Sequence, residues 1–161
     1  MPDSVQRFID EGYGSGLALA LDGDAHADVP ASLRHQRYAH ALMLALADLA
    51  GEHDLEQTVL HLSDFADDAC ERALVAAFDE RAPGEPVRGM AIIALGKMGS
   101  RELNYSSDID PIIIYDPETL PRRARDDPGE AATRIARRWV DILSARGGGG
   151  HVLRVDLRLR P

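Results

Sequence analysis

A change in hydrophobic pattern near residue 87 divides this 161-residue chain and most constrains how it can fold. The Pro-Gly-Glu-Pro segment at 83–86 stops any helix, because proline lacks an amide hydrogen and glycine weakens helical structure. The next apolar segment, Met90–Leu95, is a short unbroken run between two glycines, which is typical of a strand buried on both faces. We therefore expect a helical region over 1–86 and a β-containing core over 87–161.

Helical spacing dominates the first half of the chain. The first ten residues predict a short helix, whereas residues 11–30 are rich in Gly, Asp and Ala and are interpreted mostly as an irregular connection. Clear periodicity begins after Ser32, and Gly51 is well placed to end that helix. Its apolar stripe consists of Tyr38, Ala41, Leu42, Ala45, Leu46 and Leu49.

A further helical stretch runs from about residue 55 to residue 80. Asp54 is a suitable N-cap, and Gln57 completes a capping box with it. Ser63 is a second candidate cap, so the stretch is predicted to be two helices or one bent helix. Cys70 lies on the apolar stripe of this stretch and is expected to be a core residue.

The second half alternates between strand and helix patterns. Residues 112–115 form a second short apolar run, and residues 151–156 are interpreted as a third strand. Between them Asp127, Pro128 and Glu130 provide an N-cap, a first-turn proline and a capping-box acid. The predicted fold is therefore α+β, a helical region followed by a β-loop-β-α-β core.

Charge and composition exclude several classes of function. The formal net charge of −9 argues against nonspecific nucleic-acid binding and against a polybasic membrane surface, since both need surplus Lys and Arg. Cys70 is the only cysteine, which suits a reducing compartment. No charged-then-apolar leader and no run of about 18 apolar residues is present. We expect a cytoplasmic protein that binds neither nucleic acid nor a membrane.

The segment from residue 96 to residue 110 carries the most informative chemistry. Its glycine-containing turn follows a strand, so backbone N–H groups there can approach a phosphate without a Cβ in the way. Asp108 and Asp110 then begin the next strand, and residues i and i+2 of a strand point to the same face. Two neighbouring carboxylates beside such a turn suit Mg²⁺ bridging to nucleotide phosphates.

A third carboxylate and a set of arginines lie near the end of the chain. Asp156 offers a further carboxylate on a strand that could neighbour the first pair. Arg154, Arg158 and Arg160 alternate along one face if that strand continues, where they could reach a triphosphate, inorganic phosphate or the aspartate pair. Taken alone, a D-x-D pair is common and seldom catalytic, and an alternating Arg-Asp strand is more often a solvated face; it is their combination after the apolar strand and glycine turn that indicates catalysis.

Other nucleotide and metal motifs fail on detail. A P-loop would need Gly where Ala91 stands and Ser or Thr where Met98 stands. A Rossmann fingerprint needs G-x-G-x-x-G, which the turn lacks. An EF-hand starting at Asp108 would need Gly at Ile113.

These residues resemble the nucleotidyltransferase superfamily that includes DNA polymerase β. Within it, the pattern is similar to glutamine synthetase adenylyltransferase, with a likeness that covers most of the chain after about residue 32. The segments that carry the resemblance are Gly96-Lys97-Met98-Gly99, Glu102-Leu103-Asn104, Ser106-Ser107-Asp108-Ile109-Asp110 and Arg154-Val155-Asp156-Leu157-Arg158-Leu159-Arg160-Pro161.

The resemblance implies specific roles and partners. It assigns two Mg²⁺ ions to Asp108, Asp110 and Asp156, and it places nucleotide or phosphate against Gly99, Ser100, Ser107, Arg154 and Arg158. Family members have two such domains, one removing AMP from a tyrosine of glutamine synthetase with inorganic phosphate to give ADP, the other attaching AMP from ATP. PII proteins regulate the whole enzyme.

The resemblance favours the adenylyl-removing, amino-terminal domain. Asn104, Ile109 and Arg154 lean towards that version. The adenylylating domain and a noncatalytic nucleotide- or partner-binding module remain alternatives. Because the chain stops at Pro161, it resembles a fragment whose core is incomplete at its C-terminus, and its activity in isolation is left open.

Overall fold

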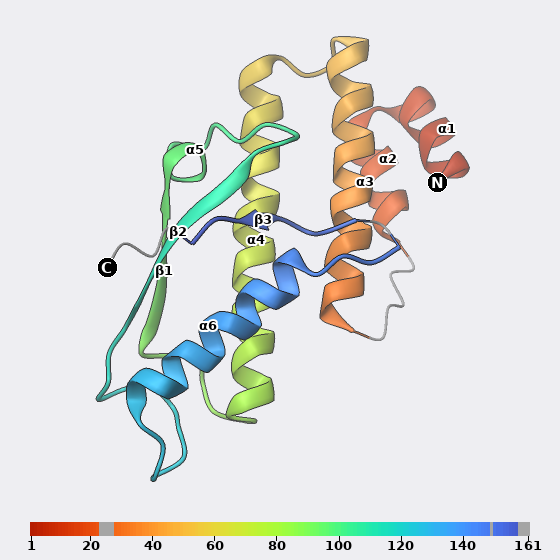
Figure 1. Cartoon of the computed structure of the whole chain (residues 1–161). Coiled ribbons are helices and arrows are strands. Elements are labelled where there is room, and N and C mark those ends of the chain that lie inside the picture. The colour runs from red at the N-terminus through yellow and green to blue at the C-terminus, as the bar shows by residue number, and fades with distance from the viewer. Residues whose placement is uncertain (23–27, 149, 158–161) are drawn as a thin grey trace.

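The computed structural model describes residues 1–22, 28–148 and 150–157, and it shows a helical region beside a small mixed sheet (Figure 1). Within this part of the chain the elements follow one another as α1 Pro2–Glu11, α2 Tyr13–Leu21, α3 Val29–Ala50, α4 Leu55–Arg81, β1 Met90–Leu95, α5 Gly96–Gly99, β2 Asp108–Tyr115, α6 Pro128–Ser144 and β3 Arg154–Val155. The α+β class and the β-loop-β-α-β order are confirmed. None of the described helices combines the length and the apolar character needed to cross a bilayer.

The two long helices α3 and α4 form a hairpin whose local signals were predicted correctly. Gly51 adopts the left-handed conformation (φ 72°) that ends α3. The Asp54 side chain accepts a hydrogen bond from the Gln57 amide, and the Gln57 side chain accepts one from the Asp54 amide, which is a complete capping box.

Two predictions about the helical region are wrong. The segment taken as irregular contains α2, which packs against α1 and α3; Gly16 allows this, since a Cβ there would stand 2.8 Å from Cβ of Phe8. Packing rather than intrinsic propensity thus stabilises this helix. Ser63 caps nothing, because α4 is continuous and the Ser63 hydroxyl donates to the carbonyl of Val59 one turn earlier.

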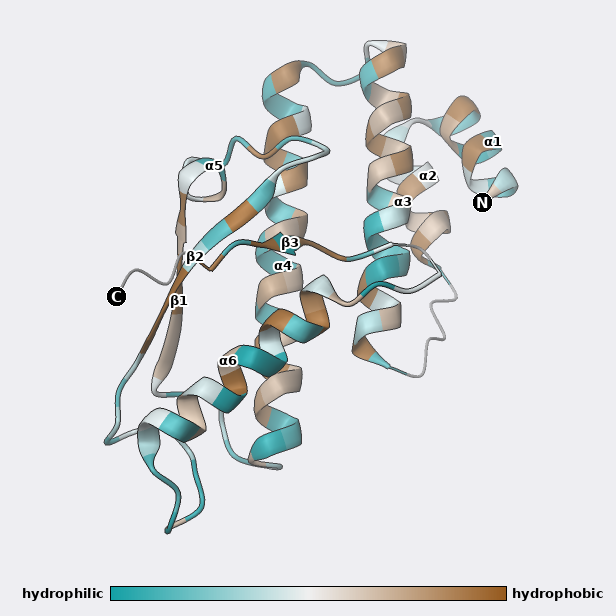
Figure 2. Ribbon diagram, viewed as in Figure 1, coloured by the Kyte–Doolittle hydropathy of each residue, from teal (hydrophilic) through white to brown (hydrophobic). Residues whose placement is uncertain are grey.

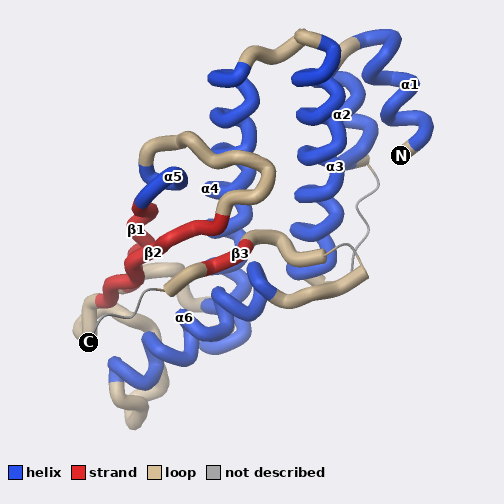
Figure 3. Tube along the Cα trace, turned by 45° about the horizontal axis from the view of Figure 1, so that its top comes forward, coloured by secondary structure: helices blue, strands red, loops and turns tan. Residues whose placement is uncertain are grey.

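The three strands form one sheet in the order β1-β2-β3, with β2 in the centre (Figure 3). β1 and β2 are antiparallel, with Leu95 opposite Asp110, whereas β2 and β3 are parallel. The third strand is shorter than predicted: only Arg154–Val155 pairs in a ladder.

The predicted burial of both sheet faces is also wrong. Burial alternates along β1, and the outward side chains of Ile93, Leu95, Ile112 and Ile114 are 43–49% exposed. The continuous brown along the second half of β2 in Figure 2 therefore belongs to a strand covered on one face only.

The covered face packs against α4 and α6. Ile109 of β2 and Trp139 of α6 belong to the same buried hydrophobic cluster, and Ile113 packs against it. Helix α6 crosses α4 diagonally (Figure 1). Trp139 is fully buried, and its Nε1 donates to the Cys70 carbonyl over 2.9 Å. Cys70 is buried as predicted, and burial raises its pKa to about 12. Since the core joins elements from both sides of residue 87, the division into 1–86 and 87–161 stays a prediction.

Candidate active site

Asp108 and Asp110 begin the central strand and project from its open face. The alternation along β2 shows this directly, because Ile109 and Pro111 are buried while Asp108 is exposed and Asp110 is half-buried. Both carboxylates therefore lie on one face, as the i, i+2 spacing predicted.

Asp156 lies beside this pair because β3 is parallel to β2. Asp108 is in register with Arg154, and the Asp156 amide donates to the carbonyl of Ile109 over 2.9 Å. Val155 is half-buried while Arg154 and Asp156 are exposed, so their side chains share the open face with the other two carboxylates. The sheet thus brings three aspartates from two neighbouring strands to one edge.

The glycine turn between β1 and β2 closes over the same edge. Gly96 has φ 55° and follows Leu95, the residue paired with Asp110. A Cβ at Gly96 would stand 3.2 Å from Oδ2 of Asp110, and one at Gly99 would stand 2.6 Å from the carbonyl oxygen of Ala94. Glycine at 96 lets the turn approach the Asp110 carboxylate, and glycine at 99 lets it pack on the backbone of β1.

The two predicted serines hold the loop that links the turn to β2. Ser100 donates from its hydroxyl to Glu102 over 3.0 Å, and its amide bonds to the Gly96 carbonyl over 3.0 Å. The Ser107 hydroxyl accepts from the Asn104 amide over 3.0 Å. Both serines therefore lie in the loop beside the aspartates, with hydrogen bonds inside the loop itself.

Of Arg154 and Arg158, which were predicted to bind phosphate, the structure describes only Arg154. Arg154 is exposed, and its guanidinium donates to the carbonyl of Ser106, which ties β3 to the loop before Asp108. Arg158 lies outside the described residues.

Arg101 anchors the loop and was not predicted. Among the described non-glycine residues only Arg101 has a positive φ (59°), and its guanidinium bridges Asp64 and Asp67 of α4, the latter at 3.0 Å. The hydrogen bond and charge of Asp64 raise the pKa of Arg101. The i, i+3 spacing of the two aspartates on a helix could have suggested a cation partner, but nothing in the sequence identifies which one.

The donor set has the right chemistry for Mg²⁺ without forming a closed cage. Within the described ranges, no three His, Cys, Asp or Glu side chains converge as a ready metal-binding group. Mg²⁺ commonly binds through one or two carboxylates, several waters and substrate phosphates. Carboxylates on neighbouring strands, beside a glycine turn, fit that mode.

A large hollow of the described structure lies elsewhere. It measures about 860 Å³ and is lined by residues of α4, α6 and the start of α3, including Val75, Phe78 and Ile142. None of the predicted site residues that the structure describes lines it.

Comparison with known proteins identifies the family. Residues 17–161 match glutamate-ammonia ligase adenylyltransferase. The chain is 40% identical to the bifunctional glutamine synthetase adenylyltransferase/adenylyl-removing enzyme of Rhizobium meliloti, with 93% of the chain and 16% of that protein covered. For the protein of the same name from Brucella suis the identity is 40%, with 99% of the chain and 17% of that protein covered.

A similar protein of Xanthobacter autotrophicus carries the same name and is 39% identical, with 89% of the chain and 16% of the relative covered. The chain therefore spans about a sixth of the length of the curated relatives it matches. The resemblance drawn from the aspartate and glycine motifs agrees with this result. The chain belongs to the glutamate-ammonia ligase adenylyltransferase family.

Proposed function

We propose that this chain is a magnesium-dependent nucleotidyl-transfer domain that removes AMP from an adenylylated tyrosine of glutamine synthetase by phosphorolysis. The observation that supports the proposal is that Asp108, Asp110 and Asp156 lie on one face at the same edge of the sheet, beside the Gly96 turn. The names of the relatives supply the protein substrate and include both adenylyl transfer and adenylyl removal.

The three aspartates would hold the metal. Asp108 and Asp110 offer oxygens from one strand face, and Asp156 offers them from the adjacent strand. Bound Mg²⁺, in two ions, supplies charge neutralisation for the phosphates and for the attacking and leaving oxygens. The residues' own contribution is to fix those oxygens before substrate arrives.

The turn and Arg154 would position the phosphates. The backbone at Gly99 and the hydroxyls of Ser100 and Ser107, which lie in the loop before Asp108, are proposed to contact phosphate oxygens. Arg154 is exposed on the carboxylate face and can neutralise phosphate charge, and Arg158 is proposed for the same role.

The reaction needs no dedicated general base. An oxygen of inorganic phosphate attacks the phosphorus of tyrosine-bound AMP, forming the new P–O bond of ADP. The bond between that phosphorus and the tyrosine oxygen breaks, and the tyrosinate takes a proton from solvent. A phosphate dianion is already nucleophilic, so the aspartates serve electrostatics and geometry.

The choice of the removing reaction rests on Asn104, Ile109 and Arg154, the residues that lean towards the adenylyl-removing version. In that setting the parent protein acts in the cytoplasm, with PII signalling proteins as regulators.

The test uses glutamine synthetase labelled with radioactive AMP on its tyrosine. The chain is mixed with it, Mg²⁺ and inorganic phosphate, and labelled ADP that appears only with phosphate supports the proposal. Transfer of label from ATP to unmodified glutamine synthetase instead would identify the adenylylating half. Silence in both reactions would contradict catalysis by this chain and favour a binding module.

A further inference from the structure

A group of arginines lines two adjoining hollows at the end of the sheet away from the aspartates. One hollow measures about 510 Å³ and the other about 340 Å³. Arg81, at the end of α4, and Arg122 and Arg123, in the segment between β2 and α6, line both. We propose that these arginine hollows bind the phosphoryl group of a small molecule at a site separate from the catalytic carboxylates.

The three shared arginines have no carboxylate partner within ion-pair distance among the described residues. This is unexpected in a chain with a net charge of −9, in which acids outnumber Lys and Arg by 27 to 18. A local surplus of guanidinium charge attracts anions.

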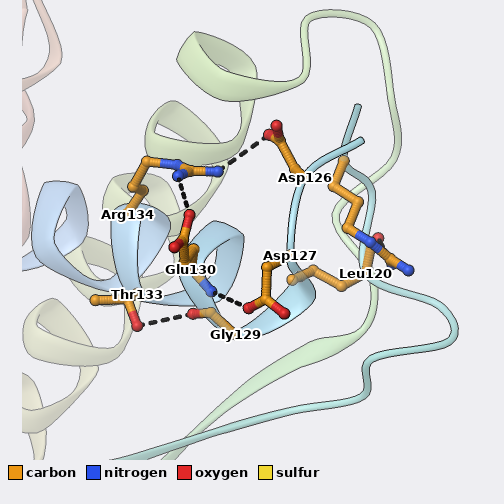
Figure 4. Close-up of polar contacts among 8 residues, drawn as sticks. Leu120, Asp126, Asp127, Gly129, Glu130, Thr133 and Arg134 are labelled. Atoms are coloured by element: carbon orange, nitrogen blue, oxygen red, sulfur yellow. Dashed lines mark hydrogen bonds and ion pairs between the residues drawn. The ribbon is translucent and has the colours of Figure 1, made fainter. Parts of the chain in front are cut away.

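The acids that line the second hollow are already paired with other arginines. Asp126 contacts Arg134 at 3.0 Å, and Arg134 also reaches Glu130 at 3.3 Å (Figure 4). Glu80 binds Arg138 through two hydrogen bonds of 2.7 Å each. The first hollow is also lined by Glu85, which contacts Arg88 at 3.9 Å, and by Glu118. In each hollow four arginines face two acids, which leaves a surplus of positive charge.

The segment that carries Arg122 and Arg123 is held in a fixed shape. The side chain of Asp116 accepts from the amide of Glu118 and the hydroxyl of Thr119, at 2.9 and 2.7 Å. Leu120 is 2% exposed and packs on Gly89, where a Cβ would stand 2.4 Å from the Leu120 nitrogen.

Arg122 is itself oriented by this turn. Its Nη1 donates to the carbonyl oxygens of Pro117 and Leu120, at 2.7 and 3.2 Å. Its remaining N–H groups are thus presented by a guanidinium that is already ordered, which lowers the entropic cost of binding an anion.

The arrangement favours a phosphoryl group over a carboxylate. Three guanidinium groups from two elements surround the hollows, and a tetrahedral phosphate can accept from several sides at once. A planar carboxylate accepts best from a single fork. Hollows of this size also suit small molecules rather than a protein surface.

This site is distinct from the proposed catalytic one. β2 has Asp108 at its first position and Tyr115 at its eighth, and an eight-residue strand spans roughly 23 Å at its usual rise per residue. The arginine segment follows Tyr115. Occupancy here is therefore independent of whether the aspartates catalyse any reaction.

The experiment is an amide NMR titration of the chain, without divalent metal, using inorganic phosphate, glycerol 3-phosphate and malonate as probes. Phosphate is expected to shift amides near residues 81–88 and 118–126, and binding is expected to weaken with added salt. Tighter binding of glycerol 3-phosphate would identify a phosphate monoester as the ligand; tighter binding of inorganic phosphate would identify the free ion. Malonate is expected to bind at least tenfold more weakly.

Paired double variants decide the assignment. Arg81→Gln with Arg123→Gln keeps the turn contacts of Arg122 and is expected to weaken phosphate binding at least tenfold. Arg125→Gln with Arg137→Gln removes the same charge from exposed positions that line neither hollow, and it is expected to change binding less than twofold. The proposal would be overturned if both double variants lost phosphate affinity equally, or if malonate bound as tightly as phosphate. Amide shifts confined to residues 96–107, or no shifts at all, would also overturn it.

Discussion

The backbone amide of Asp156 donates to the carbonyl of Ile109 over 2.9 Å, which holds the third carboxylate beside the first two. Because the pairing is parallel, the bond also brings Arg154 into register with Asp108. Removing the carboxylate charge should then affect chemistry far more than folding. We predict that Asp156→Asn lowers the rate of phosphate-dependent ADP release by about 100-fold or more, since one preorganised electrostatic group is typically worth that much.

The melting temperature checks that the loss is catalytic. Asp156 is exposed, so the Asn variant should melt within a few degrees of the original chain. Asp79→Asn, an exposed acid on α4, is the matched control and should leave the rate unchanged. A slow Asp79 variant, or a fully active Asp156 variant, would contradict the assignment.

The closeness of the glycine turn predicts a stability difference between two Gly→Ala substitutions. Gly99→Ala should lower the free energy of unfolding by about 1–3 kcal/mol, because its Cβ would stand 2.6 Å from a backbone oxygen. Gly14→Ala should be neutral or stabilise by up to about 1 kcal/mol, because that helical position has open space around it. Urea unfolding measures both, and equal effects would contradict the close approach.

The backbone conformation of Arg101 predicts that glycine is tolerated better than alanine at this position. Its left-handed backbone favours glycine, whereas its side chain bridges Asp64 and Asp67. Arg101→Ala should therefore destabilise the chain more than Arg101→Gly, by about 1 kcal/mol. Thermal unfolding of the two variants provides the comparison. If alanine proved the more stable of the two, the left-handed geometry would be wrong.

Trp139 joins α6 to α4 and should be sensitive to truncation. Trp139→Ala is expected to cost about 3–5 kcal/mol, since the ring is fully buried. Trp139→Phe keeps most of the volume but leaves the Cys70 carbonyl without the Nε1 donor, so about 1–3 kcal/mol is expected. Urea midpoints of both variants test this order; a Phe variant as unstable as the Ala variant would contradict it.

His40 predicts a pH dependence of stability. Burial lowers the pKa of His40 from its usual 6.5, with a further lowering by His61 and a smaller opposing effect of Asp68. The unfolded chain therefore binds a proton at a higher pH than the folded chain does, and stability should fall as the pH drops below about 6.5. The free energy of unfolding, measured from pH 7.5 to 5.5, should decline less in His40→Gln. An identical decline in both would exclude His40 as the cause.

Local sequence signals predicted local structure well. The Gly51 helix end and the Asp54–Gln57 capping box depend on residues within one turn, and the shared face of Asp108 and Asp110 follows from the two-residue period of a strand. These parts of the fold and site could be read directly because no distant partner decides them.

Features set by distant contacts could not be predicted in the same way. α2 forms because Gly16 lets it pack on Phe8 and α3, and hydrophobic periodicity is weak in that segment. The Arg101 anchor joins residues more than 30 positions apart. The open face carrying Ile93 and Ile112 has the same apolar sequence as a covered one, so the sequence alone cannot separate the two.

The most direct test of the central claim is paramagnetic broadening by Mn²⁺, used as a substitute for Mg²⁺. We predict that substoichiometric Mn²⁺ broadens amide signals near residues 96–100, 108–110 and 154–156. We also predict that Asp108→Asn with Asp110→Asn abolishes this broadening, while Asp79→Asn does not. Broadening centred elsewhere, or unchanged in the double variant, would contradict a metal site built by these aspartates.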